Sequence, residues 1–126
     1  MSATDNKQVI RRFYDECWNP GNTAVIDTFV APVYRDQYLA AIQAIHAAFP
    51  DLRWAIEEMI AEGDKVAIRW TLHGTHRGEY LGIAPTGKPV NWPGATIFQL
   101  AEGKIVGRSV HADMHDLRQQ LGASPA

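Results

Sequence analysis

The spacing of apolar residues changes once along this chain, around Phe49-Pro50-Asp51, and that change limits the fold more than any other feature. Before it, apolar side chains recur every three or four residues, as on one face of a helix. After it, they alternate with polar ones, as in strands that bury one face. A chain that places helices first and antiparallel strands afterwards is predicted to form an α+β domain.

Three helices are expected before the change. The first, which Thr4 or Asp5 can cap, carries a wide apolar stripe up to Trp18. Asn19-Pro20-Gly21-Asn22 has the composition of a helix stop and a turn. The other two helices are expected at residues 23–30 and 36–49.

Four strands and a short terminal helix are expected after the change. The turn sequences Glu62-Gly63-Asp64 and Ala101-Glu102-Gly103 predict two hairpins. Pro93-Gly94 interrupts the third strand, which indicates a sheet edge or a bulge there. The strands are expected at residues 52–60, 65–73, 88–100 and 104–112, and the helix at 114–121. On the first strand, one buried face is expected to hold Leu52, Trp54, Ile56 and Ile60.

Length and composition indicate one globular domain over residues 1–126, with 46% apolar residues to build its core. The net charge is −2 and no Lys/Arg cluster occurs, which argues against binding to nucleic acid or an anionic membrane surface. Cys17 is the only cysteine, so no internal disulfide can form. The polar start lacks a signal-peptide pattern, and no run reaches the roughly 18 apolar residues of a membrane span, so a soluble cytoplasmic protein is expected.

The last strand carries the most suggestive polar residues. At period two, Ser109, His111 and Asp113 share one face. The opposite face is apolar apart from one charge and consists of Val106, Arg108, Val110 and Ala112. A polar row of this kind marks either a solvated face or a site.

A catalytic triad within this row is not expected. Residues two apart on a strand lie roughly 6.5–7 Å apart, and a serine side chain is too short to close that gap to the roughly 2.6–3.2 Å of a triad contact. His111 could still orient or share a proton with Asp113. The alternatives are an Asp113 that caps the terminal helix and a His111 whose hydrogen bonds are satisfied in the core or at the rim.

Several segments together resemble the SnoaL-like polyketide cyclase (ester cyclase) family of the NTF2-like superfamily. The clearest is Gly74-Thr75-His76-Arg77-Gly78, which follows the strand-like run 61–70. The other matching segments are 12–14, 18–22, 47–52, 81–88, 103–106 and 113–122. The resemblance implies a cystatin-like cone, in which N-terminal helices pack on a curved antiparallel sheet. It also implies a homodimer through the exposed sheet face, where Arg69 and Thr71 are expected.

In the cyclases of this family, an aspartate at the end of the last long strand is the acid/base of an intramolecular aldol closure, and Asp113 matches it. The resemblance also implies that Ser109, His111 and Asp113 face the pocket. Relatives often carry tryptophan in place of Ser109 and an apolar residue in place of His111. The segment 31–38 is shorter than usual and lacks a loop that helps to roof the pocket.

Other residues have both a structural and a functional interpretation. His76 matches a position that is often histidine in relatives, or it fixes a turn by a hydrogen bond. His73, His76, His111 and Asp113 lack the tight helical spacing of a metal site, so no metal is expected. The aromatic residues that could wall a cavity or simply fill the core are Tyr14, Trp18, Trp54, Trp70 and Trp92.

The sequence therefore predicts a cofactor-independent acid/base enzyme for a small apolar carbonyl substrate, acting as a cyclase or an isomerase. Asp113, His111 and His76 are the predicted catalytic residues. Ser109 and the five aromatic residues are the predicted substrate contacts. Two alternatives remain: a module that binds a small ligand without turnover, and a dimeric scaffold whose cavity is filled by its own aromatic side chains.

Overall fold

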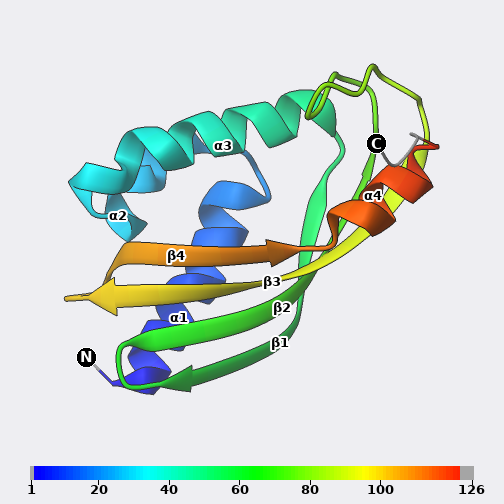
Figure 1. Ribbon diagram of the computed structural model, residues 1–126. Coiled ribbons are helices and arrows are strands. Elements are labelled where there is room, and N and C mark those ends of the chain that lie inside the picture. The colour runs from blue at the N-terminus through cyan, green and yellow to red at the C-terminus, as the bar shows by residue number, and fades with distance from the viewer. Residues whose placement is uncertain (1, 123–126) are drawn as a thin grey trace.

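The computed structural model describes residues 2–122 and forms an α+β cone, as predicted (Figure 1). The N-terminal half contains α1 (Ala3–Phe13), α2 (Ile26–Phe29) and α3 (Arg35–Ala48). A π-helical turn, Tyr14–Trp18, continues α1, and short 3-10 turns, Thr23–Val25 and Pro32–Tyr34, precede α2 and α3. The strands are β1 (Arg53–Glu62), β2 (Lys65–Thr75), β3 (Pro89–Ala101) and β4 (Lys104–Ala112), and α4 (Met114–Gln120) follows.

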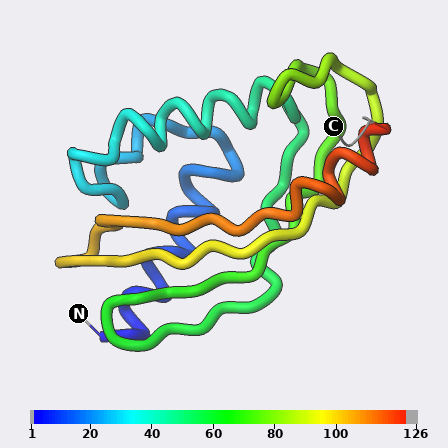
Figure 2. The backbone as a smooth tube through the Cα atoms, viewed as in Figure 1, coloured from blue at the N-terminus to red at the C-terminus, as the bar shows by residue number. Residues whose placement is uncertain are grey.

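The four strands form one antiparallel sheet in the order β1-β2-β3-β4. The sheet curves, and α1 and α3 cover its concave side (Figure 1). The backbone trace in Figure 2 shows the long β2–β3 connection beside the C-terminal end of α3. Two hydrogen bonds hold it there, from the amides of Arg77 and Gly78 to the Ala48 carbonyl, at 2.9 and 3.1 Å.

The first helix begins earlier than predicted, because Ser2 rather than Thr4 or Asp5 is its cap. The Ser2 hydroxyl accepts a hydrogen bond from the Asp5 amide, and the Asp5 carboxylate accepts one from the Ser2 amide, both at 3.1 Å. This reciprocal pair is a capping box, which satisfies two backbone donors at the helix start. The inner face of α1 then buries Ile10 and Phe13 against the sheet side of the core.

The first strand does not keep one face buried along its length. The pairing of β1 with β2 shifts register between Ile56 and Glu58, where the strand bulges. A bulge adds one residue and so exchanges the two faces beyond it. Ile60, predicted to be buried with Ile56, is therefore 64% exposed on the outer face.

Pro93-Gly94 does not interrupt the third strand and forms no bulge, because both residues pair in register with β2. Pro93 lies one residue beyond the last β3–β4 pair, Gly94 with Ala112, so its missing N–H removes no bond from that ladder. Gly94 is needed for space: a Cβ there would lie 2.3 Å from the Trp70 ring. Pro93 thus lies at a local edge, where the pairing of β3 with β4 has ended, and Gly94 serves packing.

The core lies between the helices and the concave face of the sheet. Its largest fully buried side chains include Phe13, Phe29, Phe49, Trp70 and Phe98. Among residues 2–122, no helix is both long enough and apolar enough to cross a membrane.

Candidate functional site

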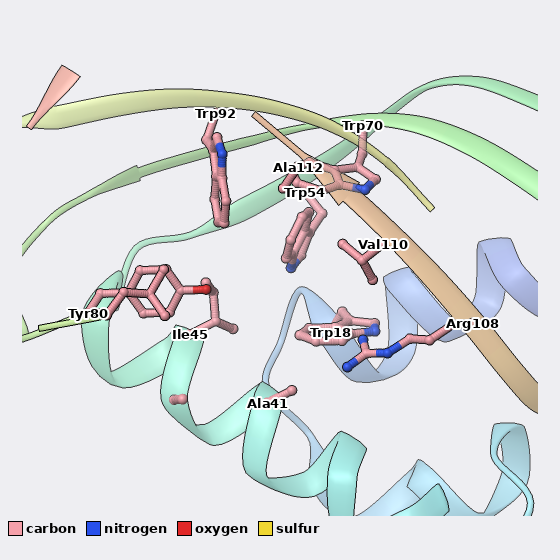
Figure 3. A pocket seen from close by; sticks show the side chains of 12 residues that line it. Trp18, Ala41, Ile45, Trp54, Trp70, Tyr80, Trp92, Arg108, Val110 and Ala112 are labelled. Atoms are coloured by element: carbon pink, nitrogen blue, oxygen red, sulfur yellow. The ribbon is translucent and has the colours of Figure 1, made fainter. Parts of the chain in front are cut away.

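A cavity of about 370 Å³ opens between α3, the concave side of the sheet and the β2–β3 connection (Figure 3). That volume falls at the lower end of the range for small-molecule sites, about 300–1,000 Å³. Its wall is mostly apolar and aromatic. It is lined by Trp18, Ala41, Ala44, Ile45, Trp54, Trp70, Tyr80, Leu81, Trp92, Arg108, Val110 and Ala112.

All four tryptophans of the chain line this cavity. They meet edge to face in a continuous row, with ring centroids 5.5 Å apart for Trp18 and Trp54, 4.7 Å for Trp54 and Trp70, and 5.6 Å for Trp70 and Trp92. Edge-to-face contacts of this kind fix ring orientation and add to the stability of burial. The predicted substrate contacts Trp18, Trp54, Trp70 and Trp92 thus lie at the cavity wall, and a binding role remains a prediction.

Trp18 and Trp54 are held by polar contacts that sequence reasoning missed. The Asn19 side chain accepts a hydrogen bond from the Trp54 amide at 2.6 Å and donates one to the Trp54 carbonyl at 3.3 Å. His46 Nε2 lies 2.6 Å from the Trp18 carbonyl. Asn19 therefore ties the end of the π-helical turn to the backbone of β1, and the edge-to-face contact of the two rings orients the indoles of Trp18 and Trp54.

The four indole N–H groups differ in their partners. Trp70 Nε1 donates to the Thr96 hydroxyl at 3.0 Å, and Trp92 Nε1 donates to the Asp113 carbonyl at 2.9 Å. Trp18 Nε1 and Trp54 Nε1 are buried and have no hydrogen-bond partner within the described chain. Both indoles belong to the residues that line the cavity (Figure 3). A buried donor without a partner is costly, so the wall of the cavity contains two unused donors.

Arg108 is the one charged residue among those that line the cavity. Its guanidinium carbon lies 4.4 Å from the centroid of the Tyr38 ring, a cation–π contact that holds the side chain against the wall. Burial raises the pKa of Tyr38 to about 12, and the nearby Arg108 charge opposes that rise. Burial also raises the pKa of Tyr80, so both phenols stay protonated at neutral pH. Every charged or buried unpaired polar group around the cavity can therefore donate a hydrogen bond.

The predicted polar row faces away from this cavity, so the expected orientation of the last strand is wrong. In the β3–β4 ladder, Val110 pairs with Thr96 and Ala112 with Gly94. Paired residues lie on the same face of a sheet, and Thr96 is buried on the concave side. Arg108, Val110 and Ala112 consequently lie on the concave side and line the open cavity, where Val110 stays 47% exposed, and Ser109 and His111 are exposed on the outer face.

The three residues of the row do not act on one another as a unit. Ser109 Oγ lies 2.7 Å from His111 Nε2, so the argument that a serine cannot reach its neighbour along a strand is wrong for this pair. The length of the histidine side chain closes the gap. Asp113 instead caps α4, since its carboxylate accepts a hydrogen bond from the Asp116 amide at 2.9 Å. Neither Ser109, His111 nor Asp113 lines the cavity.

His76 and Tyr14 also lie behind the cavity wall. His76 is fully buried, its ring packs on Phe49, and its Nδ1 accepts a hydrogen bond from the Thr86 amide at 3.3 Å. This contact closes the β2–β3 connection on itself, which agrees with the turn-fixing interpretation. Tyr14 is buried and stacks on Trp18 with centroids 6.1 Å apart, so it supports the wall without lining it. Within residues 2–122, no group of three or more His, Cys, Asp and Glu side chains could hold a metal ion.

Comparison with known proteins places these features in a family context. The family model described as SnoaL-like polyketide cyclase matches residues 8–121. No curated protein matches the chain.

Solved structures match closely along the whole chain. TsrD from Streptomyces laurentii has 25% sequence identity and a TM-score of 0.92, with 98% of this chain and 99% of that one covered. A putative SnoaL-like polyketide cyclase from Jannaschia sp. CCS1 has 26% identity and a TM-score of 0.88, over 98% and 95% of the two chains. IdmH, a putative polyketide cyclase from Streptomyces antibioticus, has 25% identity and a TM-score of 0.81, over 94% and 99%.

Proposed function

Because the chain belongs to the SnoaL-like polyketide cyclase family, we propose that it is a cofactor-independent cyclase or isomerase for a small, apolar carbonyl compound. One observation carries this proposal. The cavity is walled by aromatic rings, and its unpaired polar groups are the indole N–H groups of Trp18 and Trp54 and the guanidinium of Arg108.

Such a donor set suits a reaction that creates negative charge on oxygen. When a proton leaves the carbon beside a carbonyl, the charge moves to the carbonyl oxygen as an enolate. Donors that are already oriented stabilise that oxygen without having to reorganise, and removing one donor of this kind costs about 10²–10³ in rate. Trp18 and Trp54 are held in place by their packing and by Asn19, so they meet this requirement.

Asp113 is the proposed acid/base of this reaction, and its position sets a condition on that role. Its backbone borders the cavity, because Ala112 lines the wall and the Asp113 carbonyl receives the Trp92 N–H. Its carboxylate caps α4, so it would have to leave the cap to reach a substrate. His111 and His76 lie outside the cavity, and we assign them no step.

Proton exchange provides a test that does not need the natural substrate. Benzoylacetone, an aromatic β-diketone, exchanges the hydrogens between its carbonyls for deuterium through an enolate. We expect the protein to accelerate this exchange in D2O, as followed by NMR, and we expect Arg108→Gln and Trp54→Phe to slow it. Arg12→Gln is a matched control, because Arg12 also lies over an aromatic ring, Phe29, but pairs with Glu16. An exchange rate equal to that of buffer would contradict the proposal.

A binding module without turnover is the second candidate. Among the described residues that line the cavity, none carries a carboxylate or an imidazole, so a proton acceptor is not yet in place. Binding of an aromatic ketone without faster exchange would favour this candidate over the enzyme.

We also propose that two copies pair through the outer face of the sheet. Ile60 and Ile97 are 64% and 42% exposed there, beside the Arg69–Glu58 ion pair at 3.3 Å. Size-exclusion chromatography with light scattering should give a dimer mass, and Ile97→Asp should reduce it to that of a monomer. A wild-type monomer at micromolar concentration would refute this pairing.

A further inference from the structure

The unpaired donors of the cavity point to a ligand that is already an anion. We propose that the cavity binds a small aromatic carboxylic acid, whose carboxylate lies between the Arg108 guanidinium and the indole N–H groups of Trp18 and Trp54. This inference rests on the proposed function, because it assumes that the cavity is the ligand site. It adds that the ligand carries its charge before any reaction takes place.

The positive charge of Arg108 in the cavity wall is the first observation that favours a carboxylate ligand. Within residues 2–122, no carboxylate oxygen lies within 4.0 Å of its guanidinium, and among the residues that line the cavity Arg108 alone is charged. The cation–π contact with Tyr38 holds the plane of the guanidinium and leaves its N–H edge available. A guanidinium presents paired donors that match the two oxygens of a carboxylate.

The indole N–H groups of two tryptophans in the wall are the second observation. Trp18 Nε1 and Trp54 Nε1 can only donate, and they are buried without partners in the described chain. The centroids of their rings are 5.5 Å apart, so the two indoles form one part of the wall. Arg108 lies over Tyr38, whose ring centroid is 6.4 Å from that of Trp18, so the guanidinium belongs to the same end of the cavity. A ligand that satisfies donors from all three residues needs several acceptor lone pairs on one group, and a carboxylate has about four.

The third argument is the fit of the remainder of the ligand. The cavity volume, about 370 Å³, equals that of roughly a dozen water molecules. The wall beyond the donors is apolar and consists of indole rings, alanines and Ile45. A flat system of one or two fused rings matches both this size and this wall.

Naphthoate and methyl naphthoate form a matched pair of probes, because they share the ring system and differ in the charge of the head group. All four tryptophans line the cavity, so quenching of tryptophan fluorescence reports its occupancy. We expect naphthoate to bind about tenfold more tightly than the ester, as one charge-assisted hydrogen-bonded contact would give. Arg108→Gln should remove this preference, and Trp54→Phe should reduce it.

Two controls separate the head-group contacts from general damage. Arg12→Gln should keep the preference, since Arg12 pairs with Glu16 and does not line the cavity. Arg35→Gln should also keep it, because Arg35 pairs with Asp27 and does not line the cavity. Equal binding of acid and ester, or a preference that survives in Arg108→Gln, would overturn this inference and leave the proposed function standing. If neither probe binds, both fail.

Discussion

Replacing Gly94 with alanine should displace Trp70 and thereby damage both the core and the cavity wall. An alanine Cβ would lie 2.3 and 2.4 Å from two carbons of the Trp70 ring. Carbon atoms in contact lie about 3.5–4.0 Å apart, so the ring would have to retreat by roughly 1 Å. Trp70 is 2% exposed and packs edge to face against Trp54 and Trp92, so a retreat of its ring would break these contacts and push the indole into the cavity.

The expected cost combines two effects. Overpacking a core of this kind costs about 1–3 kcal/mol. Displacing the ring also strains the Trp70–Thr96 hydrogen bond, whose net contribution is about 0.5–1.5 kcal/mol. Gly94→Ala should therefore lower the free energy of unfolding by about 2–4 kcal/mol, which corresponds to a fall in Tm of about 8–16 °C for a domain of this size.

Urea and thermal unfolding measure this effect directly, and β4 offers a matched control. At Gly107 an added Cβ would meet nothing closer than 3.8 Å, so Gly107→Ala should be nearly neutral. The near-ultraviolet circular dichroism of the tryptophans should change only in Gly94→Ala. Equal stability of the two variants would refute the argument that Gly94 exists to make room for Trp70.

Three further predictions concern titratable side chains. Asp113→Ala should lower the free energy of unfolding by about 0.5–2 kcal/mol through loss of the α4 cap, while Asp113→Asn should keep the cap and the stability. Lost turnover in the stable Asn variant would show an acid/base role, and unchanged turnover would limit Asp113 to capping. The pKa of Tyr38 is raised to about 12, so the folded phenol stays neutral while the unfolded one ionises near 10. The free energy of unfolding should therefore fall as pH rises between these two values. Urea unfolding across alkaline pH should show a smaller fall in Tyr38→Phe. Hydrogen bonds from the Thr75 amide and hydroxyl lower the pKa of Asp51. The stability that this carboxylate contributes is therefore present above the ordinary carboxyl pKa and is lost as pH falls through the lowered one. Asp51→Asn should reduce the loss of stability at acid pH, and an unchanged loss would contradict this.

The order of the elements could be predicted from the sequence because helix and strand periods differ strongly. The π-helical turn at Tyr14–Trp18 and the bulge after Ile56 could not, since both depend on tertiary packing rather than on local pattern. The bulge alone turns Ile60 outward.

Which face of the last strand points inward could not be predicted from the sequence either. Period two separates Ser109 and His111 from Arg108 and Val110, but it does not say which set faces inward. The pairing of Val110 with Thr96 decides this, and it is a long-range contact. The one signal in the sequence was Arg108, a single charge on an otherwise apolar face, and this face is the one that lines the cavity.

A crystal structure of the protein soaked with naphthoate tests most directly whether the tryptophan-lined cavity is the functional site. We expect the fused rings to lie among Trp54, Trp70 and Trp92, with the carboxylate oxygens within hydrogen-bond distance of the Arg108 guanidinium and of the Trp18 or Trp54 N–H. An empty cavity, or naphthoate bound instead beside Ser109 and His111 on the outer face of the sheet, would contradict it.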